Sequence, residues 1–227
     1  MSQLVMNQKK FDERRKRAAK IVSYLKKTYP VPKTELVYDT DFQLLSAVIL
    51  SAQCTDKKVN AVADKLWKKY KTVADFARMD REVFEREISG ITYYRSKARY
   101  IQESAQLVVA NFDGKVPKTE KELITLPGVA YKTAHVVLNE LFNISEGIPT
   151  DTHVRRFALR FDLVDNTVLS KISKELEALI PKKDWKYVNN GLVLYGRYVC
   201  NAIPHDCSKH PLTKLWPKAG MIWPKAK

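Results

Sequence analysis

A lysine and an aspartate are the side chains in this sequence whose positions most favour chemistry. Lys132 lies in the first turn of a helix predicted from Lys132 to Leu141, directly after a Pro-Gly turn. Backbone amides at the start of a helix lack intrahelical partners and form a site suited to a phosphate. Asp151 begins the next helical pattern, where the exposed amides and the helix dipole favour a carboxylate. The pattern therefore places an amine beside any phosphate that the turn holds, and an acid farther along the chain.

These two residues must be positioned by the elements around them. The amphipathic run from Thr119 to Ile124 predicts a short helix, and Leu126-Pro-Gly-Val-Ala130 predicts a tight turn before the helix of Lys132. The result is a helix, a hairpin turn and a helix. Such a hairpin also occurs in DNA-binding proteins that have no catalytic activity, so by itself it does not predict an enzyme.

The rest of the chain is predicted to be helical, which gives an all-α fold. The run Phe42–Leu50 is apolar nearly all round, which suits a helix buried within a bundle. A buried strand would also suit this run, but no partner strand is evident. The Pro-rich tail after Pro204 is predicted to be irregular. Further helices are expected at about residues 9–28, 56–70, 72–79, 80–88, 96–111, 151–159, 169–180 and 185–198.

Composition points to a polyanionic partner. Forty Lys and Arg against 25 Asp and Glu give a net charge of +15, which favours nucleic acid, although excess lysine can also serve solubility alone. The three cysteines are too few for a disulfide framework, which favours a reducing compartment. No signal peptide or membrane-spanning run is evident. We expect a soluble intracellular protein in the cytoplasm or nucleoid, monomeric, with no membrane partner.

Four motifs together resemble the endonuclease III family of helix-hairpin-helix DNA glycosylases. Leu126-Pro-Gly-Val-Ala-Tyr-Lys-Thr-Ala134 resembles the family's L-P-G-V-G-x-K-T-A, and Thr150-Asp-Thr-His153 resembles its V-D-T-H. Leu50-Ser-Ala-Gln-Cys-Thr-Asp56 and Tyr195-Gly-Arg-Tyr-Val-Cys200 extend the resemblance to roughly residues 35–200. The resemblance implies a two-lobed fold with a central groove. One lobe would be a helical barrel domain with the hairpin, residues 34–145, and the other would combine residues 1–33 with 146–227.

The resemblance also implies a bifunctional DNA glycosylase and AP lyase of base-excision repair, acting on double-stranded DNA that contains oxidised or damaged pyrimidines or abasic sites. Lys132 would attack the sugar and form a Schiff base, and Asp151 would stabilise the sugar cation and relay protons. Two alternatives remain open: a non-catalytic helix-hairpin-helix DNA-binding protein, and a monofunctional mismatch glycosylase. Taken alone, Lys132 could be only a phosphate-contacting or solvated lysine, and Asp151 only an N-cap.

DNA contacts are predicted at five further positions. Gln53 matches the family's intercalating glutamine, and Tyr93 stands where relatives often have a leucine wedge; both would fill the gap left by a flipped nucleotide. Gly128, Ala130 and Thr133 would contact the phosphates from the hairpin. Ala130 replaces the second glycine of the family's hairpin, which would weaken DNA binding if that position needed a close phosphate approach or a positive φ, at a cost of about 1 kcal/mol.

The C-terminal segment departs from the family. Most members end in C-x6-C-x2-C-x5-C, four thiolates for a [4Fe–4S] cluster. Cys200 and Cys207 keep the first interval, but His210 and Trp216 occupy the third and fourth positions. We therefore expect no cluster in this degenerate loop. A zinc site of Cys200, His205, Cys207 and His210 is chemically conceivable, but its spacing is unusual, and we expect no metal and no other cofactor.

Overall fold

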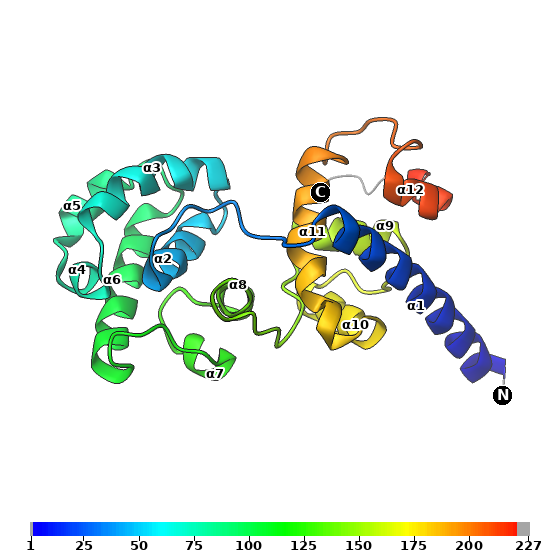
Figure 1. The fold of residues 1–227 in the computed structure, drawn as a ribbon, viewed down its shortest axis with the longest axis horizontal. Helices are drawn as coiled ribbons and strands as arrows, with labels where there is room; N and C mark the ends of the chain where they lie inside the picture. The colour runs from blue at the N-terminus through cyan, green and yellow to red at the C-terminus, as the bar shows by residue number, and fades with distance from the viewer. Residues whose placement is uncertain (1, 222–227) are drawn as a thin grey trace. The chain divides into compact units, whose positions relative to one another are not determined.

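The computed structural model describes residues 2–221, and every regular element in that range is a helix (Figure 1). The prediction of an all-α fold is confirmed, and Phe42–Leu50 is helical rather than a strand. No helix within residues 2–221 is both long and apolar enough to cross a membrane. The elements are α1 (Ser2–Thr28), α2 (Asp41–Ser51), α3 (Asp56–Lys69), α4 (Val73–Arg78), α5 (Arg81–Glu87), α6 (Tyr94–Asn111), α7 (Glu120–Leu123), α8 (Tyr131–Phe142), α9 (Thr152–Arg160), α10 (Leu169–Leu179), η1 (Lys182–Asp184), α11 (Trp185–Tyr198), α12 (Pro211–Leu215) and η2 (Pro217–Gly220).

The chain forms two compact units, each with its own hydrophobic core. The middle unit is Thr34–Glu146, and the terminal unit combines Met1–Lys33 with Gly147–Lys227. The hairpin and Lys132 belong to the middle unit, whereas Asp151 and the C-terminal cysteines belong to the terminal unit.

Helix α2 forms the centre of the middle unit. It packs against α3, α6 and α8, and its residues from Phe42 to Leu50 are all buried. A capping box begins the helix: Thr40 Oγ1 accepts from the backbone amide of Gln43 at 3.3 Å, and Gln43 Oε1 accepts from the amide of Thr40 at 3.1 Å. An apolar surface on all sides suits this position, because neighbouring helices cover every face.

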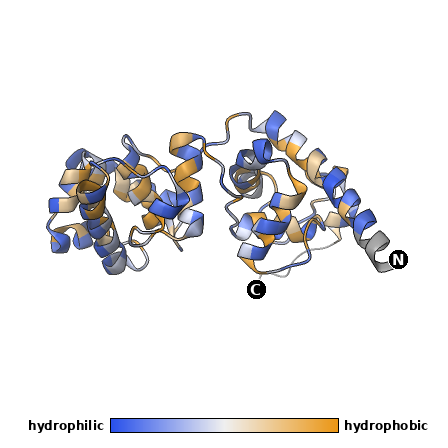
Figure 2. Ribbon diagram, turned by 90° about the horizontal axis from the view of Figure 1, so that it is seen from below, coloured by the Kyte–Doolittle hydropathy of each residue, from blue (hydrophilic) through white to orange (hydrophobic). Residues whose placement is uncertain are grey.

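Helix α1 packs against α10, α11 and α12 of the terminal unit. Most of this helix is hydrophilic (Figure 2), yet Ala18, Ile21, Val22 and Leu25 are buried at helical spacing. The basic residue Arg14 lies against the loop after α9, where its guanidinium contacts Asp162 at 2.6 Å. Burial of an apolar stripe and ion pairing at its edge together fix α1 to residues more than a hundred positions away.

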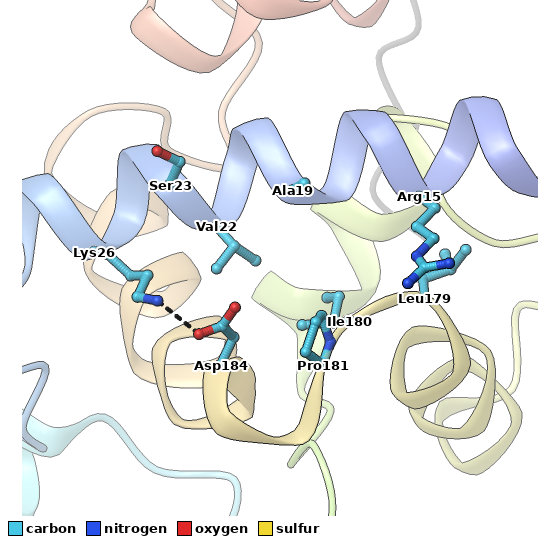
Figure 3. Close-up of a pocket in the computed structure, with 9 residues that line it drawn as sticks. All are labelled: Arg15, Ala19, Val22, Ser23, Lys26, Leu179, Ile180, Pro181 and Asp184. Atoms are coloured by element: carbon cyan, nitrogen blue, oxygen red, sulfur yellow. Dashed lines mark hydrogen bonds and ion pairs between the residues drawn. The ribbon is translucent and has the colours of Figure 1, made fainter.

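A cavity of about 530 Å³ lies between α1 and the corner that joins α10 to η1. Figure 3 shows Lys26 pointing from α1 toward Asp184, and the two side chains form an ion pair at 2.6 Å. Val22, Ile180 and Pro181 supply apolar walls.

The prediction of an irregular tail after Pro204 is wrong in part, because α12 and η2 form there. Pro211 and Pro217 each lie in the first turn of their helix, where a missing backbone N–H costs nothing. Trp216 separates the two helices and stacks on the guanidinium of Arg17, 3.5 Å from ring centroid to Cζ.

Candidate functional site

The hairpin of the middle unit consists of α7, a turn and α8. Thr119 begins α7, where its side chain accepts from the amide of Glu122 at 3.2 Å. Within the turn, the amide of Val129 donates to the carbonyl of Leu126 at 3.1 Å. His135 Nε2 lies 2.6 Å from a carboxylate oxygen of Glu120, which joins the two helices of the hairpin. The predicted helix-hairpin-helix is therefore confirmed as local structure.

Gly128 and Ala130, the two positions of the turn at which the family has glycine, differ in backbone conformation. Gly128 has φ +78°, and a Cβ at this position would lie 2.9 Å from Cβ of Tyr100 on α6. Ala130 has φ −87° and ψ 169°, an extended conformation open to any residue. The concern that Ala130 needs a positive φ is therefore wrong: the left-handed position in the turn is Gly128. The effect of Ala130 on phosphate approach stays a prediction.

Lys132 lies in the first turn of α8 with its side chain exposed, and Thr133 beside it is half-buried. The N-cap of this helix is Ala130, which has no side-chain oxygen to cap the first amides of α8. Ser104 of α6 holds the preceding turn by donating to the carbonyl of Pro127 at 2.9 Å. The exposed residue Lys132 thus lies at a helix start whose approach is fixed by packing.

Gln53, Tyr93 and Gly128 come from three separate segments and line one cavity of about 280 Å³. Gln53 and Tyr93 have positive φ values of 53° and 58°, and Tyr93 is 64% exposed. Non-glycine residues in this region are uncommon and gather where surrounding structure enforces them, often at functional sites. Three of the predicted DNA contacts therefore share one surface of the middle unit.

Lys97 is a residue of this cavity that the sequence analysis missed. Its amine is buried, with the residue 4% exposed, and it donates to the carbonyls of Leu50 at 2.7 Å and Ala52 at 2.6 Å. Burial lowers the pKa of Lys97. The amine thereby holds the C-terminal end of α2 just before Gln53. The sequence does contain a signal for this burial: Lys97 precedes Ile101 by four residues, which places it on the apolar face of α6.

Asp151 is the N-cap of α9 in the terminal unit. Its Oδ1 accepts from the amides of His153 and Val154, both at 2.9 Å, and the residue is half-buried. The segment before it is held by Asn189, whose side chain donates to the carbonyl of Pro149 at 2.7 Å. The capping interpretation of Asp151 is confirmed.

Two motifs that lie far apart in the sequence meet beside this cap. A Cβ at Gly196 of α11 would overlap Nδ1 of His153 and lie 2.8 Å from a guanidinium nitrogen of Arg156. That same nitrogen of Arg156 donates to the carbonyl of Cys200 at 2.8 Å. The glycine of Tyr195-Gly-Arg therefore permits α11 to approach the segment that begins with Asp151.

The C-terminal segment brings three potential metal ligands together. Cys200, His205 and His210 each offer one ligand atom, and these atoms lie within 4.8 Å of one another. Cys200 is buried, and the two histidines are half-buried. The guanidinium of Arg160, itself buried, donates to the sulfur of Cys200 at 3.0 Å and also to the sulfur of Cys207.

Comparison with known proteins gives one consistent family. The model of the HhH-GPD superfamily of base excision DNA repair proteins matches residues 46–182. An Endonuclease III from Synechocystis is 41% identical over 93% of this chain and 96% of its own. An Endonuclease III from Bacillus subtilis is 38% identical over 82% and 85%, respectively. A solved structure of a trapped Endonuclease III-DNA covalent intermediate is 35% identical, with a TM-score of 0.83 over 90% of this chain and 96% of that one.

The expectation that this protein has no metal or cofactor is wrong. The chain has a Cys-His-His group whose ligand atoms converge where a metal ion can bind. The sequence argument failed because it judged ligands by their spacing. A loop can bring ligand atoms of unusual spacing to one point, and here it does.

The match covers more than half of the chain, and the curated relatives align along most of their own length. A solved non-covalent Endonuclease III-DNA complex shares 35% identity and a TM-score of 0.83 with this chain. The chain belongs to the endonuclease III family of the HhH-GPD superfamily, and it is a DNA-binding DNA glycosylase of base-excision repair.

Proposed function

We propose that this protein is a bifunctional DNA glycosylase and AP lyase that removes oxidised or damaged pyrimidines and then cleaves the strand 3′ to the abasic site. Lys132 is the nucleophile in this proposal, and Asp151 is the acid that stabilises the sugar cation and relays protons. The enzyme acts as a monomer on double-stranded DNA.

The chemistry requires an amine without its proton. The lone pair of Lys132 Nζ attacks C1′ of the sugar, the bond from C1′ to the base breaks, and the base leaves with the bonding electrons and accepts a proton. Opening of the sugar ring converts the adduct to a Schiff base. The Schiff base acidifies the adjacent C2′, so that loss of a C2′ proton expels the 3′ phosphate. Water then releases the lysine.

The position of Lys132 is the observation that supports this proposal most strongly. It extends from the first turn of α8, directly after the left-handed turn at Gly128, where a strand held by the hairpin would pass. A 35% identical relative has been solved as a covalent intermediate with DNA, which is the kind of species that a lysine nucleophile forms.

The cavity of the middle unit supplies the residues for base flipping. A nucleotide moved out of the duplex leaves a gap, and Gln53 and Tyr93 are exposed on one surface beside the hairpin turn. We propose that Gln53 fills the gap and that the ring of Tyr93 stacks against the neighbouring base. Gly128, Ala130 and Thr133 then contact the phosphates.

Borohydride trapping on a duplex with one abasic site tests the role of Lys132. The wild-type protein is expected to form a covalent adduct, and Lys132→Gln is expected to form none while still binding DNA. Lys121→Gln is a matched control, since Lys121 is another exposed lysine of the same hairpin. Absence of an adduct in the wild type would reject the lyase and favour a monofunctional glycosylase or a binding protein.

Asp151→Asn separates capping from chemistry. Asparagine is as good an N-cap as aspartate, so its oxygen can still accept from the amides of His153 and Val154. We expect unchanged thermal stability, retained trapping on abasic DNA, and base excision slower by about 100-fold or more, measured in single turnover on a duplex with one oxidised pyrimidine. An unchanged excision rate would refute the catalytic role of Asp151.

A further inference from the structure

The segment that joins α11 to α12 contains a group of ligands that base excision does not use. Residues 201–204 and 208–209 are exposed, whereas Cys200 and Cys207 are buried and the rings of His205 and His210 are half-buried. A solvent-exposed loop with two imidazoles and two thiols turned inward needs an interaction that holds those groups there. Figure 1 shows this loop, in orange, between α11 and α12.

The imidazoles are oriented as metal ligands are. His205 Nδ1 lies 2.7 Å from the carbonyl of Ile203, and because a carbonyl only accepts, Nδ1 bears the proton and Nε2 keeps its lone pair. A second ring nitrogen that donates to a backbone carbonyl is the usual arrangement of a metal-bound histidine. His210 Nδ1 is buried and has no hydrogen-bond partner among residues 2–221. The two rings lie 5.0 Å apart between centroids.

Both sulfur atoms accept from one buried guanidinium, and burial raises the pKa of the Cys200 thiol. Arg160 is 1% exposed, and two of its guanidinium nitrogens donate to the sulfurs of Cys200 and Cys207. Guanidinium N–H groups only donate, so both sulfurs are acceptors here, as thiolate ligands of a metal are. The Nε atom of Arg160 is fixed separately by the carbonyl of Ala219, at 2.6 Å. This arginine therefore serves as an outer partner for sulfur ligands.

We propose that the terminal unit binds one zinc ion through Cys200 Sγ, His205 Nε2 and His210 Nδ1, with Cys207 Sγ as the fourth ligand. Two thiolates and two imidazoles in a tetrahedral set are typical of structural zinc sites. Two thiolates balance the double positive charge of the ion. The ion ties residues 200–210 to one another, Arg160 of α9 contacts both sulfurs, and four ligands leave no open position for a substrate.

Metal content of the full-length protein tests this proposal. Protein produced without a histidine tag in medium that contains both zinc and iron should hold about one equivalent of zinc by mass spectrometry of the elements. The double variant His205→Gln and His210→Gln should lose it, whereas Cys54→Ser, a matched thiol change in the middle unit, should retain it. Iron with acid-labile sulfide and visible absorbance, or a wild-type protein without zinc, would overturn the proposal.

Two further readouts do not depend on enzymatic activity. Cobalt should replace zinc and give thiolate-to-metal absorption bands that disappear in Cys200→Ser. A chelator should lower the melting temperature of the wild type but not that of the double histidine variant. If the double variant fails to fold, His210→Cys provides a second test. A thiolate can replace the imidazole as a ligand, so this variant should still bind zinc. Loss of zinc in a folded His210→Cys protein would reject His210 as a ligand.

Discussion

Gly128→Ala tests whether the hairpin turn depends on one left-handed residue packed against α6. Gly128 has φ +78°, and an added Cβ would lie 2.9 Å from both Cβ and Cδ2 of Tyr100. A left-handed conformation costs an L-residue about 1–2 kcal/mol, and overpacking adds about 1–3 kcal/mol. Cβ of Tyr100 cannot move without the backbone of α6, so the two costs add. We expect the free energy of unfolding to fall by about 2–5 kcal/mol.

Gly90→Ala is the matched control, because a Cβ at Gly90 meets nothing within 4 Å and its φ is not positive. Its effect on stability should lie within about 0.5 kcal/mol. By differential scanning calorimetry, Gly128→Ala should melt about 4–20 °C lower than this control, given about 2–4 °C per kcal/mol for a chain of this size.

The same substitution should weaken DNA binding, because the hairpin turn and the cavity of Gln53 and Tyr93 share Gly128. At a temperature where both variants are folded, fluorescence anisotropy with an uncleavable abasic analogue should give a Kd about tenfold higher or more for Gly128→Ala, equivalent to about 1.4 kcal/mol. Equal melting temperatures and equal Kd values for the two alanine variants would refute the assignment of Gly128 as the strained, closely packed position.

Two further predictions concern one buried amine and one exposed carboxylate. Lys97→Met leaves the carbonyls of Leu50 and Ala52 without the donor that now lies at 2.7 and 2.6 Å, so urea unfolding should show a loss of about 2–4 kcal/mol; a loss below about 0.5 kcal/mol would mean that other donors replace the amine. Hydrogen bonds from Arg14 and Lys10 hold the pKa of Asp165 well below its model-compound value of 3.8. The unfolded chain therefore binds more protons than the folded chain at low pH, so this contribution is complete above about pH 4 and is lost as the pH falls toward the folded pKa. Asp165→Asn should accordingly make the melting temperature less sensitive to pH between 6 and 2, and an unchanged pH profile would contradict the ion-pair assignment.

Local interactions let the sequence determine the elements. The Pro-Gly turn, the oxygen-bearing caps at Thr72 and Asp80, and the apolar run of α2 all act within a few residues. Helices α2, α4, α5 and α7 accordingly begin and end near the predicted positions. The Asp151 cap is predictable for the same reason, since its carboxylate binds amides two and three residues away. Net charge is likewise a property of composition, and it indicated a polyanionic partner without any structure.

Tertiary structure decided the features that depend on distant segments. Lys97 looks like a surface lysine in the sequence, yet α6 buries it against the end of α2. Gly196 must lack a Cβ only because α11 packs closely against His153, a contact that the sequence does not reveal. The spacing of Cys200, His205 and His210 argued against a metal site, whereas the path of the loop brings their ligand atoms within 4.8 Å. Sequence spacing reports distance along the chain, and only packing of the folded chain converts it into distance in space.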